Sequence, residues 1–149
     1  LVVEGVAKDR LIDSRSAAEY GLSANGAGWG ESPSALSMNG GSLALDDVLK
    51  ELGTGLYISN LWYLNFSDRT AGRITGMTRF ATFWVENGKI KAPVSTMRFD
   101  DSIFSLLGSA LEQLTREREL ILSASTYSQR QTASNLLPGA LISKLTLTL

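Results

Sequence analysis

The Asn87-Gly88 pair restricts the fold of this chain more than any other local feature. Both residues accept positive φ, and Asn-Gly between two alternating apolar runs is a strong signal of a two-residue β-hairpin. Such runs lie on both sides of the pair, over residues 81–94. The turn sets Glu86 opposite Lys89 as a cross-strand charge pair and gathers the apolar members of both runs on one face. The sequence therefore predicts an antiparallel hairpin.

Pro93 interrupts the second arm of this hairpin. In the register set by the turn it lies opposite Thr82, and proline has no N–H to donate to a ladder. We therefore expect a bulge, a sheet edge or the end of pairing near Pro93. On the polar face the same register places Trp84 opposite Lys91, which predicts a cation–π contact.

Two amphipathic helices are predicted. Residues 43–52 place apolar side chains at i, i+3, i+4 and i+7, and Gly53 is suited to end that helix. Asp100 or Asp101 is suited to begin a second helix, whose apolar face continues as far as Leu114. A shorter helix is expected to start at Asp13 or Ser14.

Strands are expected to make up most of the remaining regular structure. Residues 55–64 are rich in aromatic and branched side chains, residues 119–127 look similar, and residues 140–149 alternate between apolar and polar. An interruption of regular secondary structure is expected at Leu137-Pro138-Gly139, and a polar turn is expected at residues 65–70. The sum is an α+β fold, mainly antiparallel sheet in a sandwich or partly open barrel, with two amphipathic helices.

The length of 149 residues fits one domain, residues 1–149. A domain of this size buries roughly 70% of the surface of its unfolded chain, so it needs no disulfide or metal to fold. The first residues, Leu1-Val-Val-Glu-Gly-Val6, read like the middle of a strand–turn unit and lack the basic start of a signal peptide. We therefore expect the chain to be a piece of a longer protein, and removal of a tag or proteolytic processing is the alternative explanation.

The chain contains no His and no Cys. A Ser-His-Asp triad, a Cys nucleophile and a His-based or thiolate zinc site cannot be built from these residues alone. The net charge of −1 provides no global field for nucleic acid, and no apolar run reaches the ~18 residues of a membrane span. We expect no nucleic-acid or membrane partner.

Two short glycine-containing stretches, Gly53-Thr-Gly55 and Thr75-Gly76, are the nearest candidates for ligand-binding loops. Neither has the spacing of a Walker A motif or a dinucleotide fingerprint, so turn geometry is the preferred interpretation of both. Asp68-Arg69 and the stretch from Arg73 to Arg79 surround a turn and could bind a carboxylate bidentately. Exposed loop charges explain these residues equally well.

The order of the segments is more specific than any one of them. Gly53-Thr-Gly-Leu-Tyr-Ile58 is followed by Thr75-Gly76, by Trp84-Val-Glu-Asn-Gly-Lys-Ile90 and by Pro93-Val94, and a final strand follows Pro138. This succession resembles the C-terminal domain of the TldD/PmbA family, which is also described as modulator of DNA gyrase and whose members look like metal-dependent peptidases. The resemblance covers almost the whole chain.

The resemblance implies a non-catalytic domain that forms one wall of a peptide cleft and contributes to a dimer. In this family two His of an upstream HExxxH helix are the expected ligands of a divalent metal, Zn or Fe, and one branch adds a Cys near the last loop. The matching region here has Ala124 between Ser123 and Ser125. This chain is therefore expected to hold no metal alone. It is expected to be closer to the PmbA-like branch of the family, or to an actinobacterial or cyanobacterial relative.

The resemblance also implies a cytoplasmic location, a peptide substrate, and a homodimer or a TldD/PmbA-type heterodimer. No catalytic residue is expected in this chain, whereas five residues are candidates for contact with substrate: Gly55, Thr75, Gly76, Arg79 and Pro93. The stretch Thr75-Gly-Met-Thr-Arg79 departs from the usual Thr-Gly-Asp-Phe-Ser of the family. The alternative interpretation is a free-standing β-rich module that binds proteins or peptides and has no link to a peptidase.

Overall fold

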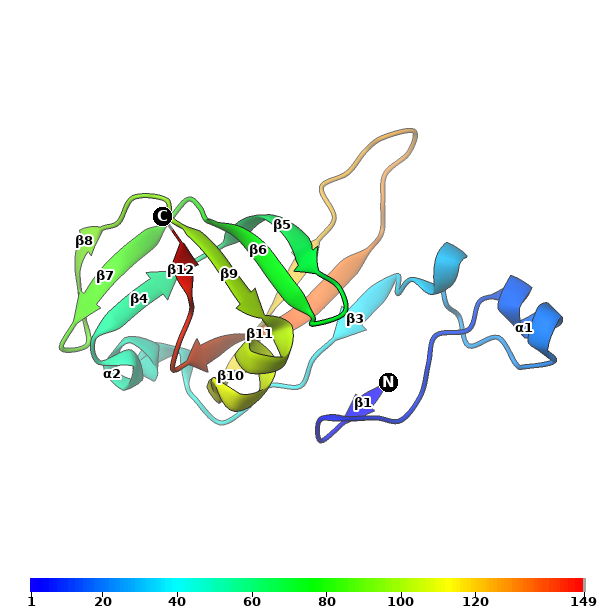
Figure 1. Cartoon of the computed structure of the whole chain (residues 1–149), viewed down its shortest axis with the longest axis horizontal. Helices are drawn as coiled ribbons and strands as arrows, with labels where there is room; N and C mark the ends of the chain where they lie inside the picture. Colours follow the sequence, from blue (N-terminus) through cyan, green and yellow to red (C-terminus); the bar gives the residue numbers. More distant parts are fainter. Residues whose placement is uncertain (149) are drawn as a thin grey trace. The chain divides into compact units, whose positions relative to one another are not determined.

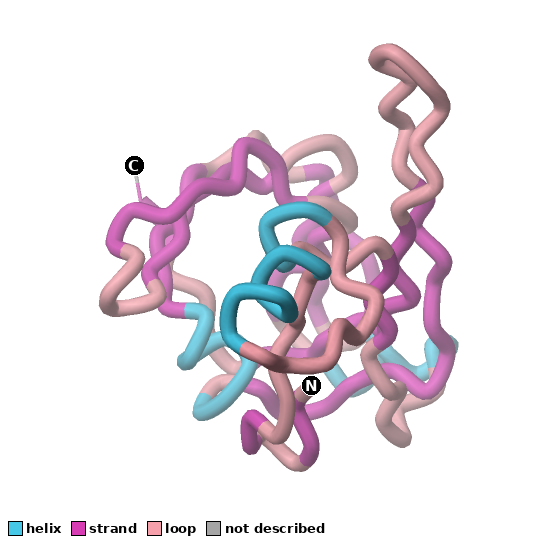
Figure 2. The backbone as a smooth tube through the Cα atoms, turned by 90° about the vertical axis from the view of Figure 1, so that its right-hand side faces the viewer, coloured by secondary structure: helices cyan, strands magenta, loops and turns pink. Residues whose placement is uncertain are grey.

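The computed structural model describes residues 1–148 and divides into two compact units (Figure 1). Unit 1 comprises residues 1–39 and 118–137, and unit 2 comprises residues 40–117 together with the chain from residue 138 onward. Strands and loops account for most of the backbone, and the helices are short (Figure 2). No helix in the described part of the chain is long and apolar enough to cross a membrane.

Unit 1 is built from short elements. A two-stranded antiparallel hairpin of β1 (Val2–Val3) and β2 (Val6–Ala7) is followed by helix α1 (Ser14–Tyr20), the 3₁₀ turn η1 (Trp29–Glu31) and strand β3 (Ala35–Ser37). Strand β3 pairs in parallel with the first residues of β11 (Ser134–Ile142). Strand β10 (Leu111–Leu122), of which residues 118–122 belong to unit 1, lies on the other side of β11.

Unit 2 contains two antiparallel sheets. One sheet has the order β12-β9-β6-β5, with β5 (Leu61–Asp68), β6 (Arg73–Thr78), β9 (Arg98–Ser102) and β12 (Leu147–Thr148). The other has the order β4-β7-β8, with β4 (Gly55–Ile58), β7 (Thr82–Glu86) and β8 (Lys89–Pro93). The helical elements are η2 (Leu45–Asp47), α2 (Val48–Leu52) and the π-helical turn η3 (Ser105–Ser109). The α+β class with mainly antiparallel sheet is confirmed.

The ends of α1 follow from their capping residues. The Asp13 carboxylate accepts hydrogen bonds from the N–H groups of Arg15 and Ser16, at 3.0 and 2.9 Å. These donors, Ser16 first, lower the pKa of Asp13 below its ordinary value. Gly21 ends the helix in the left-handed region at φ 65°, where glycine has no steric penalty. The predicted short helix is confirmed.

The hairpin of β7 and β8 turns at Asn87 and Gly88, both with positive φ, as predicted. Glu86 pairs with Lys89, but a bulge follows Val85, so that Trp84 lies opposite Ala92. The bulge predicted near Pro93 is therefore present, although it changes the register beyond the first two pairs. Among the strands of the described chain, β8 pairs only with β7, so Pro93 lies on a sheet edge.

Three contacts predicted for this hairpin are wrong. Because of the bulge, Pro93 lies opposite Phe83 instead of Thr82. The ion pair of Glu86 is with Lys91, at 3.7 Å, rather than with Lys89. With Lys91 engaged there, the predicted Trp84–Lys91 cation–π contact is not among the cation–π pairs of the described residues.

The second predicted amphipathic helix is wrong over most of its length. Asp100 and Asp101 belong to strand β9, which pairs with β6 through five residues and buries Phe99 completely. Helical structure follows only briefly, and its last turn closes with a hydrogen bond from Ala110 N–H to the Ser105 carbonyl. Residues from Leu111 onward form β10. The apolar spacing was helical, but strand pairing on both sides of the turn prevailed over it.

Four smaller boundaries also differ from the prediction. Strand β5 continues through most of the expected turn at residues 65–70, and Thr75-Gly76 lies inside β6. Strand β10 covers residues 111–122 instead of 119–127. Pro138-Gly139 lies within β11, so the single strand expected over residues 140–149 is wrong: β11 ends at Ile142 and β12 covers only Leu147–Thr148, while the last residue lies outside the described part of the chain. Gly139 fits there because its N–H donates to the Thr115 hydroxyl at 2.7 Å.

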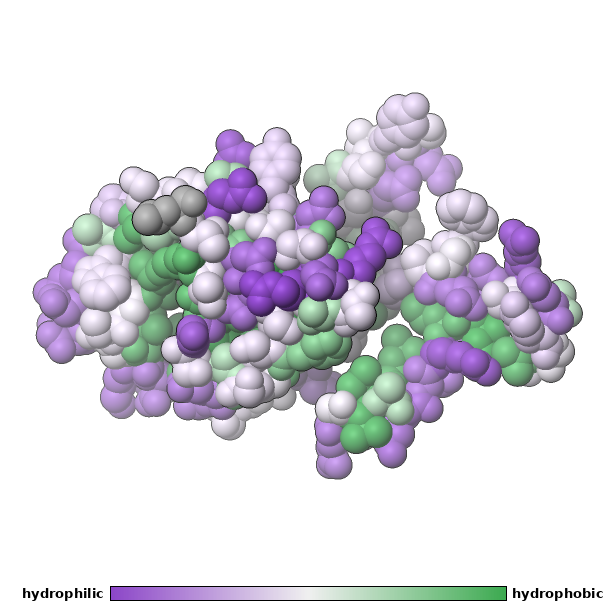
Figure 3. Space-filling model, viewed as in Figure 1, coloured by the Kyte–Doolittle hydropathy of each residue, from purple (hydrophilic) through white to green (hydrophobic). Residues whose placement is uncertain are grey.

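The buried apolar side chains all belong to unit 2. They are Leu43, Val85, Phe99, Leu106, Ala110 and Leu141. Many other large apolar side chains are exposed, and apolar groups reach the surface over the face drawn in Figure 3. An isolated domain with so many exposed apolar groups has surfaces suited to partners.

Candidate functional site

The outward face of the four-stranded sheet of unit 2 carries several polar residues of β6 and β9. Residues two apart along a strand share a face, so Thr75 and Met77 of β6 point to the same side. Their partners on β9 are Asp100 and Arg98, respectively. The intervening residues point into the core, as shown by the complete burial of Phe99. The pairing of β6 with β9 therefore places Thr75, Met77 and their partners on the face that is open to a ligand.

A small pocket opens on this outward face. Its volume is about 160 Å³, and it is lined by Tyr63, Thr75, Gly76, Met77 and Arg98. The Thr75 hydroxyl donates to the Phe99 carbonyl at 2.9 Å, which fixes the side chain at the pocket floor. Two of the residues predicted from the sequence, Thr75 and Gly76, thus lie in one pocket.

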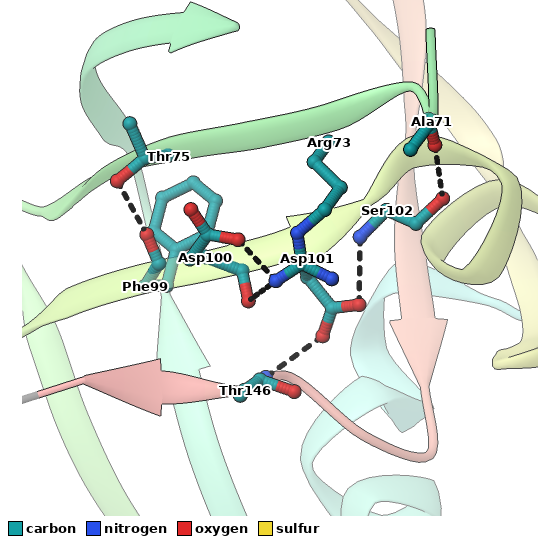
Figure 4. Close-up of polar contacts among 8 residues, drawn as sticks. All are labelled: Ala71, Arg73, Thr75, Phe99, Asp100, Asp101, Ser102 and Thr146. Atoms are coloured by element: carbon teal, nitrogen blue, oxygen red, sulfur yellow. Dashed lines mark hydrogen bonds and ion pairs between the residues drawn. The ribbon is translucent and has the colours of Figure 1, made fainter. Parts of the chain in front are cut away.

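Arg73 and Asp100 form an ion pair beside this pocket (Figure 4). The Ser67 hydroxyl and then the Arg73 guanidinium lower the pKa of Asp100, although partial burial acts in the opposite direction. An aspartate with a lowered pKa is ionised at neutral pH and is a poor proton donor. Asp100 therefore orders the sheet rather than providing acid catalysis.

Asp101 faces the opposite side of β9 and binds backbone groups. Its carboxylate accepts from the Thr146 N–H at 2.9 Å and from the Ser102 N–H at 2.8 Å (Figure 4). Burial, the largest influence on this group, raises its pKa, but these hydrogen bonds together lower it below the ordinary value. Asp101 thereby connects the segment before β12 to β9.

An exposed aromatic cluster lies at the start of β5. We define it as Trp62, Tyr63, Arg79 and Phe80. Trp62 makes edge-to-face contacts with the Tyr63 and Phe80 rings, each with centroids 5.9 Å apart. The Arg79 guanidinium lies over both of those rings, 6.0 Å from the Tyr63 centroid and 5.8 Å from the Phe80 centroid.

The backbone of the aromatic cluster is unusual. Tyr63 has φ 52° and Phe80 has φ 67°, a region that bulky residues rarely adopt. Tyr63 lies in a register shift of β5 between Trp62 and Asn65. Such strained positions cost of order 1–3 kcal/mol each and concentrate at functional sites. The exposed fractions of Trp62, Tyr63 and Phe80 are 44%, 71% and 69%, respectively.

The structure brings together only part of the predicted site. Arg79 belongs to the aromatic cluster and contacts Tyr63, which also lines the pocket. Gly55 and Pro93 lie on the three-stranded sheet, opposite Val85 and Phe83, respectively, and neither lines the pocket.

Sequence reasoning missed five residues of this surface: Trp62, Tyr63, Met77, Phe80 and Arg98. The aromatic composition of residues 61–66 was the only available signal. It predicted a strand but not the bulge that turns Tyr63 toward β6.

The residues present do not suit a metal centre. In the described part of the chain, no three acidic side chains come together in a way that could hold an ion. Asp100 and Asp101 are adjacent, but they point to opposite faces of β9 and are occupied by Arg73 and by backbone N–H groups. No step of a metal-dependent reaction can be assigned to this chain.

Comparison with known proteins gives one consistent family. A family model described as the PmbA/TldA metallopeptidase C-terminal domain matches residues 1–149. Metalloprotease PmbA of Escherichia coli O157:H7 is 35% identical over 95 residues, which are 64% of this chain and 20% of that protein. The chain therefore spans about a fifth of this relative.

Solved structures share the fold. A candidate modulator of a DNA gyrase from Thermotoga maritima has a TM-score of 0.73 at 20% identity, over 97% of this chain and 31% of that one. TldE from Thermococcus kodakarensis has a TM-score of 0.73 at 16% identity, over 96% of this chain and 31% of that one. A candidate modulator of DNA gyrase from Bacteroides thetaiotaomicron has a TM-score of 0.69 at 21% identity, over 97% of this chain and 29% of that one.

At these identities the structural likeness shows the fold alone, whereas the family model covers the complete sequence. The resemblance seen in the order of the sequence motifs is thereby confirmed. The chain belongs to the PmbA/TldD metallopeptidase family and corresponds to the C-terminal domain of its members.

Proposed function

We propose that this chain is the non-catalytic C-terminal domain of a cytoplasmic metal-dependent peptidase and forms one wall of its peptide cleft. Residues outside this chain would bind the divalent metal, Zn or Fe, because no His or Cys is available here. The observation that carries the proposal is strand β5. It is eight residues long and carries exposed aromatic side chains, and within residues 1–148 its only neighbour in the sheet is β6.

The register shows which backbone groups of β5 face away from the sheet. The Thr78 N–H donates to the Met97 carbonyl at 2.9 Å, so Thr78 points its backbone toward the β9 side. Leu61 lies opposite Thr78, and in an antiparallel ladder both members of such a pair point away from each other. The Leu61 N–H and carbonyl therefore face the free edge, next to the aromatic cluster.

The same argument applies to Phe66, which lies opposite Ile74, four residues before Thr78. Its N–H also faces the free edge, where it donates to the Asn65 side-chain oxygen at 2.8 Å. Of these two N–H groups, the one of Phe66 is covered within its own strand, whereas the one of Leu61 is in position for a partner. An extended peptide that adds as a further strand would bind through such groups.

A dimer contact is the second part of the proposal, as a homodimer or a TldD/PmbA-type heterodimer. Three consecutive apolar residues near the end of β10, Leu120, Ile121 and Leu122, are exposed by 59%, 48% and 59%. Consecutive residues of a strand point to both faces, so a partner that covers this segment would bury apolar area on each. We assign the dimer contact to this segment of unit 1.

The strand-addition part is tested by fluorescence anisotropy with labelled extended peptides. Leu61→Pro removes the edge N–H without breaking a bond to β6, because proline is tolerated where its nitrogen faces away from the ladder. We expect peptide affinity to fall about tenfold or more, in line with the loss of one or two hydrogen bonds.

Leu61→Ala is the matched control, since it shortens the same side chain and keeps the N–H. A peptide whose alternate backbone nitrogens are methylated should bind poorly to the unmodified chain. Equal binding of the methylated and unmethylated peptides would contradict strand addition.

A further inference from the structure

We infer that the aromatic cluster and the adjoining pocket together bind the C-terminal carboxylate and the apolar last side chain of a peptide. This inference rests on the proposed peptide-binding function and adds which part of the peptide is recognised, namely its C-terminus. Tyr63 joins the two parts, because it belongs to the aromatic cluster and also lines the pocket.

Two arginines beside Tyr63 provide the charge. Arg79 lies over the Tyr63 ring, and Arg98 lines the pocket with it. Among residues 1–148, neither guanidinium has a carboxylate within ion-pair distance, whereas Arg73 is paired with Asp100. An arginine beside a ring matches a planar carboxylate through two parallel N–H donors. The local charge is therefore complementary to one carboxylate.

The apolar part of the ligand has a surface of its own. The pocket of about 160 Å³ suits a single side chain, and Met77 supplies an adaptable apolar wall. Outside the pocket the Trp62 and Phe80 rings are 44% and 69% exposed. Aromatic groups of this kind contribute much contact area at a low cost in side-chain entropy.

The backbone conformation supports a binding role for these rings. Tyr63 and Phe80 are both held at positive φ, on segments joined by the hydrogen bond from the Arg79 N–H to the Asn60 carbonyl at 3.2 Å. Because both residues are exposed, their strained backbone conformation does not contribute to packing of the core. The conformation holds both rings beside Arg79 before a ligand binds, which reduces the conformational entropy lost on binding.

The same observations disfavour a nucleic acid as the occupant. Single-stranded nucleic acid needs a track of positive charge together with rings on which successive bases stack. Here Asp100 neutralises Arg73 on the same sheet face, so that only Arg79 and Arg98 of the described residues place a guanidinium at the aromatic cluster or the pocket, and Arg69 lies apart over the Phe66 ring. The Trp62 ring meets its neighbours edge to face, at 80° and 70°, and so presents no parallel platform.

The experiment compares four fluorescein-labelled ligands on the 149-residue chain. The first is a hexapeptide that ends in phenylalanine with a free carboxylate, and the second is its C-terminal amide. The third carries an internal glutamate and an amidated end, and the fourth is an oligothymidylate. We expect the free-acid peptide to bind about tenfold or more tightly than the amide, as suits a charge-assisted bidentate contact.

Arg98→Gln and Arg79→Gln should each abolish the preference for the free acid. Arg69→Gln is the matched control, because Arg69 lies over the exposed Phe66 ring at 5.9 Å on the same sheet but outside the pocket. It should retain the preference. Circular dichroism and the Tm establish that each variant is folded.

The outcomes separate this inference from the proposed function. Equal affinity for the acid and the amide would overturn the inference and leave strand addition intact, since strand addition needs no free terminus. Binding of the internal-glutamate peptide as tightly as the free acid would also overturn it, as would tighter binding of the oligothymidylate. If no peptide binds at all, the proposed function fails as well. A preference for the free acid that survives backbone methylation would support the inference and contradict strand addition.

Discussion

The ring of Phe99 lies against the backbone of Gly76, directly across from it on the neighbouring strand. A Cβ atom built on Gly76 would lie 2.8 Å from Phe99 Cε1 and 3.0 Å from Leu64 Cδ2. Phe99 is completely buried, so it has little room to move away. This close approach requires glycine at position 76 for packing, while the other side of the same backbone lines the pocket.

Gly76→Ala is therefore expected to destabilise the fold by about 1–3 kcal/mol through overpacking. Thermal unfolding followed by circular dichroism should show a lower Tm. Gly108→Ala is the control, since a Cβ atom there meets nothing within 4 Å. A Tm that Gly76→Ala leaves unchanged would show that Phe99 can shift after all.

Thr78 and Thr82 are both almost fully buried, but they differ in hydrogen bonding. The Thr78 hydroxyl accepts from the Met97 N–H at 3.1 Å, whereas the Thr82 hydroxyl has no partner. Thr78→Val should cost about 1–3 kcal/mol because it leaves a donor unsatisfied, and Thr82→Val should be neutral or stabilising. Urea denaturation of the two variants measures the difference. Equal losses in both would contradict this assignment.

Acid should destabilise unit 2 in part through Asp101. Burial raises the pKa of this group, but hydrogen bonds from Thr146 and Ser102 together lower it below its ordinary value of 3.8. The unfolded chain therefore takes up the proton first as the pH falls, and the stability contributed by ionised Asp101 is present above pH 3.8 and lost below it. Asp101→Asn should show a weaker dependence of unfolding free energy on pH in that range. Parallel curves for variant and parent would contradict the prediction.

Metal content should distinguish this chain from the longer protein of which we expect it to be a part. With no His and no Cys, the purified chain should carry Zn or Fe well below one equivalent. A longer form that includes an upstream HExxxH helix should carry about one equivalent. Elemental analysis by mass spectrometry decides between these outcomes. Stoichiometric zinc in the 149-residue chain would contradict our account of the domain.

Removing the Asn65 side chain should expose the edge of β5. In Asn65→Ala the Phe66 N–H loses its acceptor and becomes available to a peptide. We expect tighter binding of extended peptides and a greater tendency to associate, measured by anisotropy and by light scattering. Asn65→Asp is the control, since it retains an oxygen acceptor for the same N–H. Weaker peptide binding by Asn65→Ala would mean that this amide is not part of the site.

The features predicted correctly from the sequence are those set by neighbours in the chain. Asp13 caps α1, Gly21 ends it, and Asn87-Gly88 forms the hairpin turn. Each of these needs only a local φ or a hydrogen bond to a residue within a few positions. The order of the motifs also identified the family, because it reflects the complete chain.

The features that the sequence did not reveal depend on partners far along the chain. Asp100-Asp101 has the chemistry of a helix start, yet pairing with β6 makes it a strand. Gly139 has the chemistry of a residue that interrupts a strand, but its N–H is satisfied by the Thr115 hydroxyl, 24 positions away in the sequence. The pocket could not be predicted for the same reason, since Tyr63 and Arg98 meet only after two strand pairings and a bulge have formed.

The hydrogen bond between the Asn65 side chain and the Phe66 N–H also affects how copies of this chain behave toward one another. A free strand edge lined with aromatic residues is a template on which identical chains can grow into fibres. With one of its donors already satisfied, the edge offers an interrupted ladder to another copy. A short ligand that needs only the donor at Leu61 can still bind. The Asn65 side chain should therefore limit the self-association of the chain during storage at high concentration, in addition to weakening its binding of extended peptides.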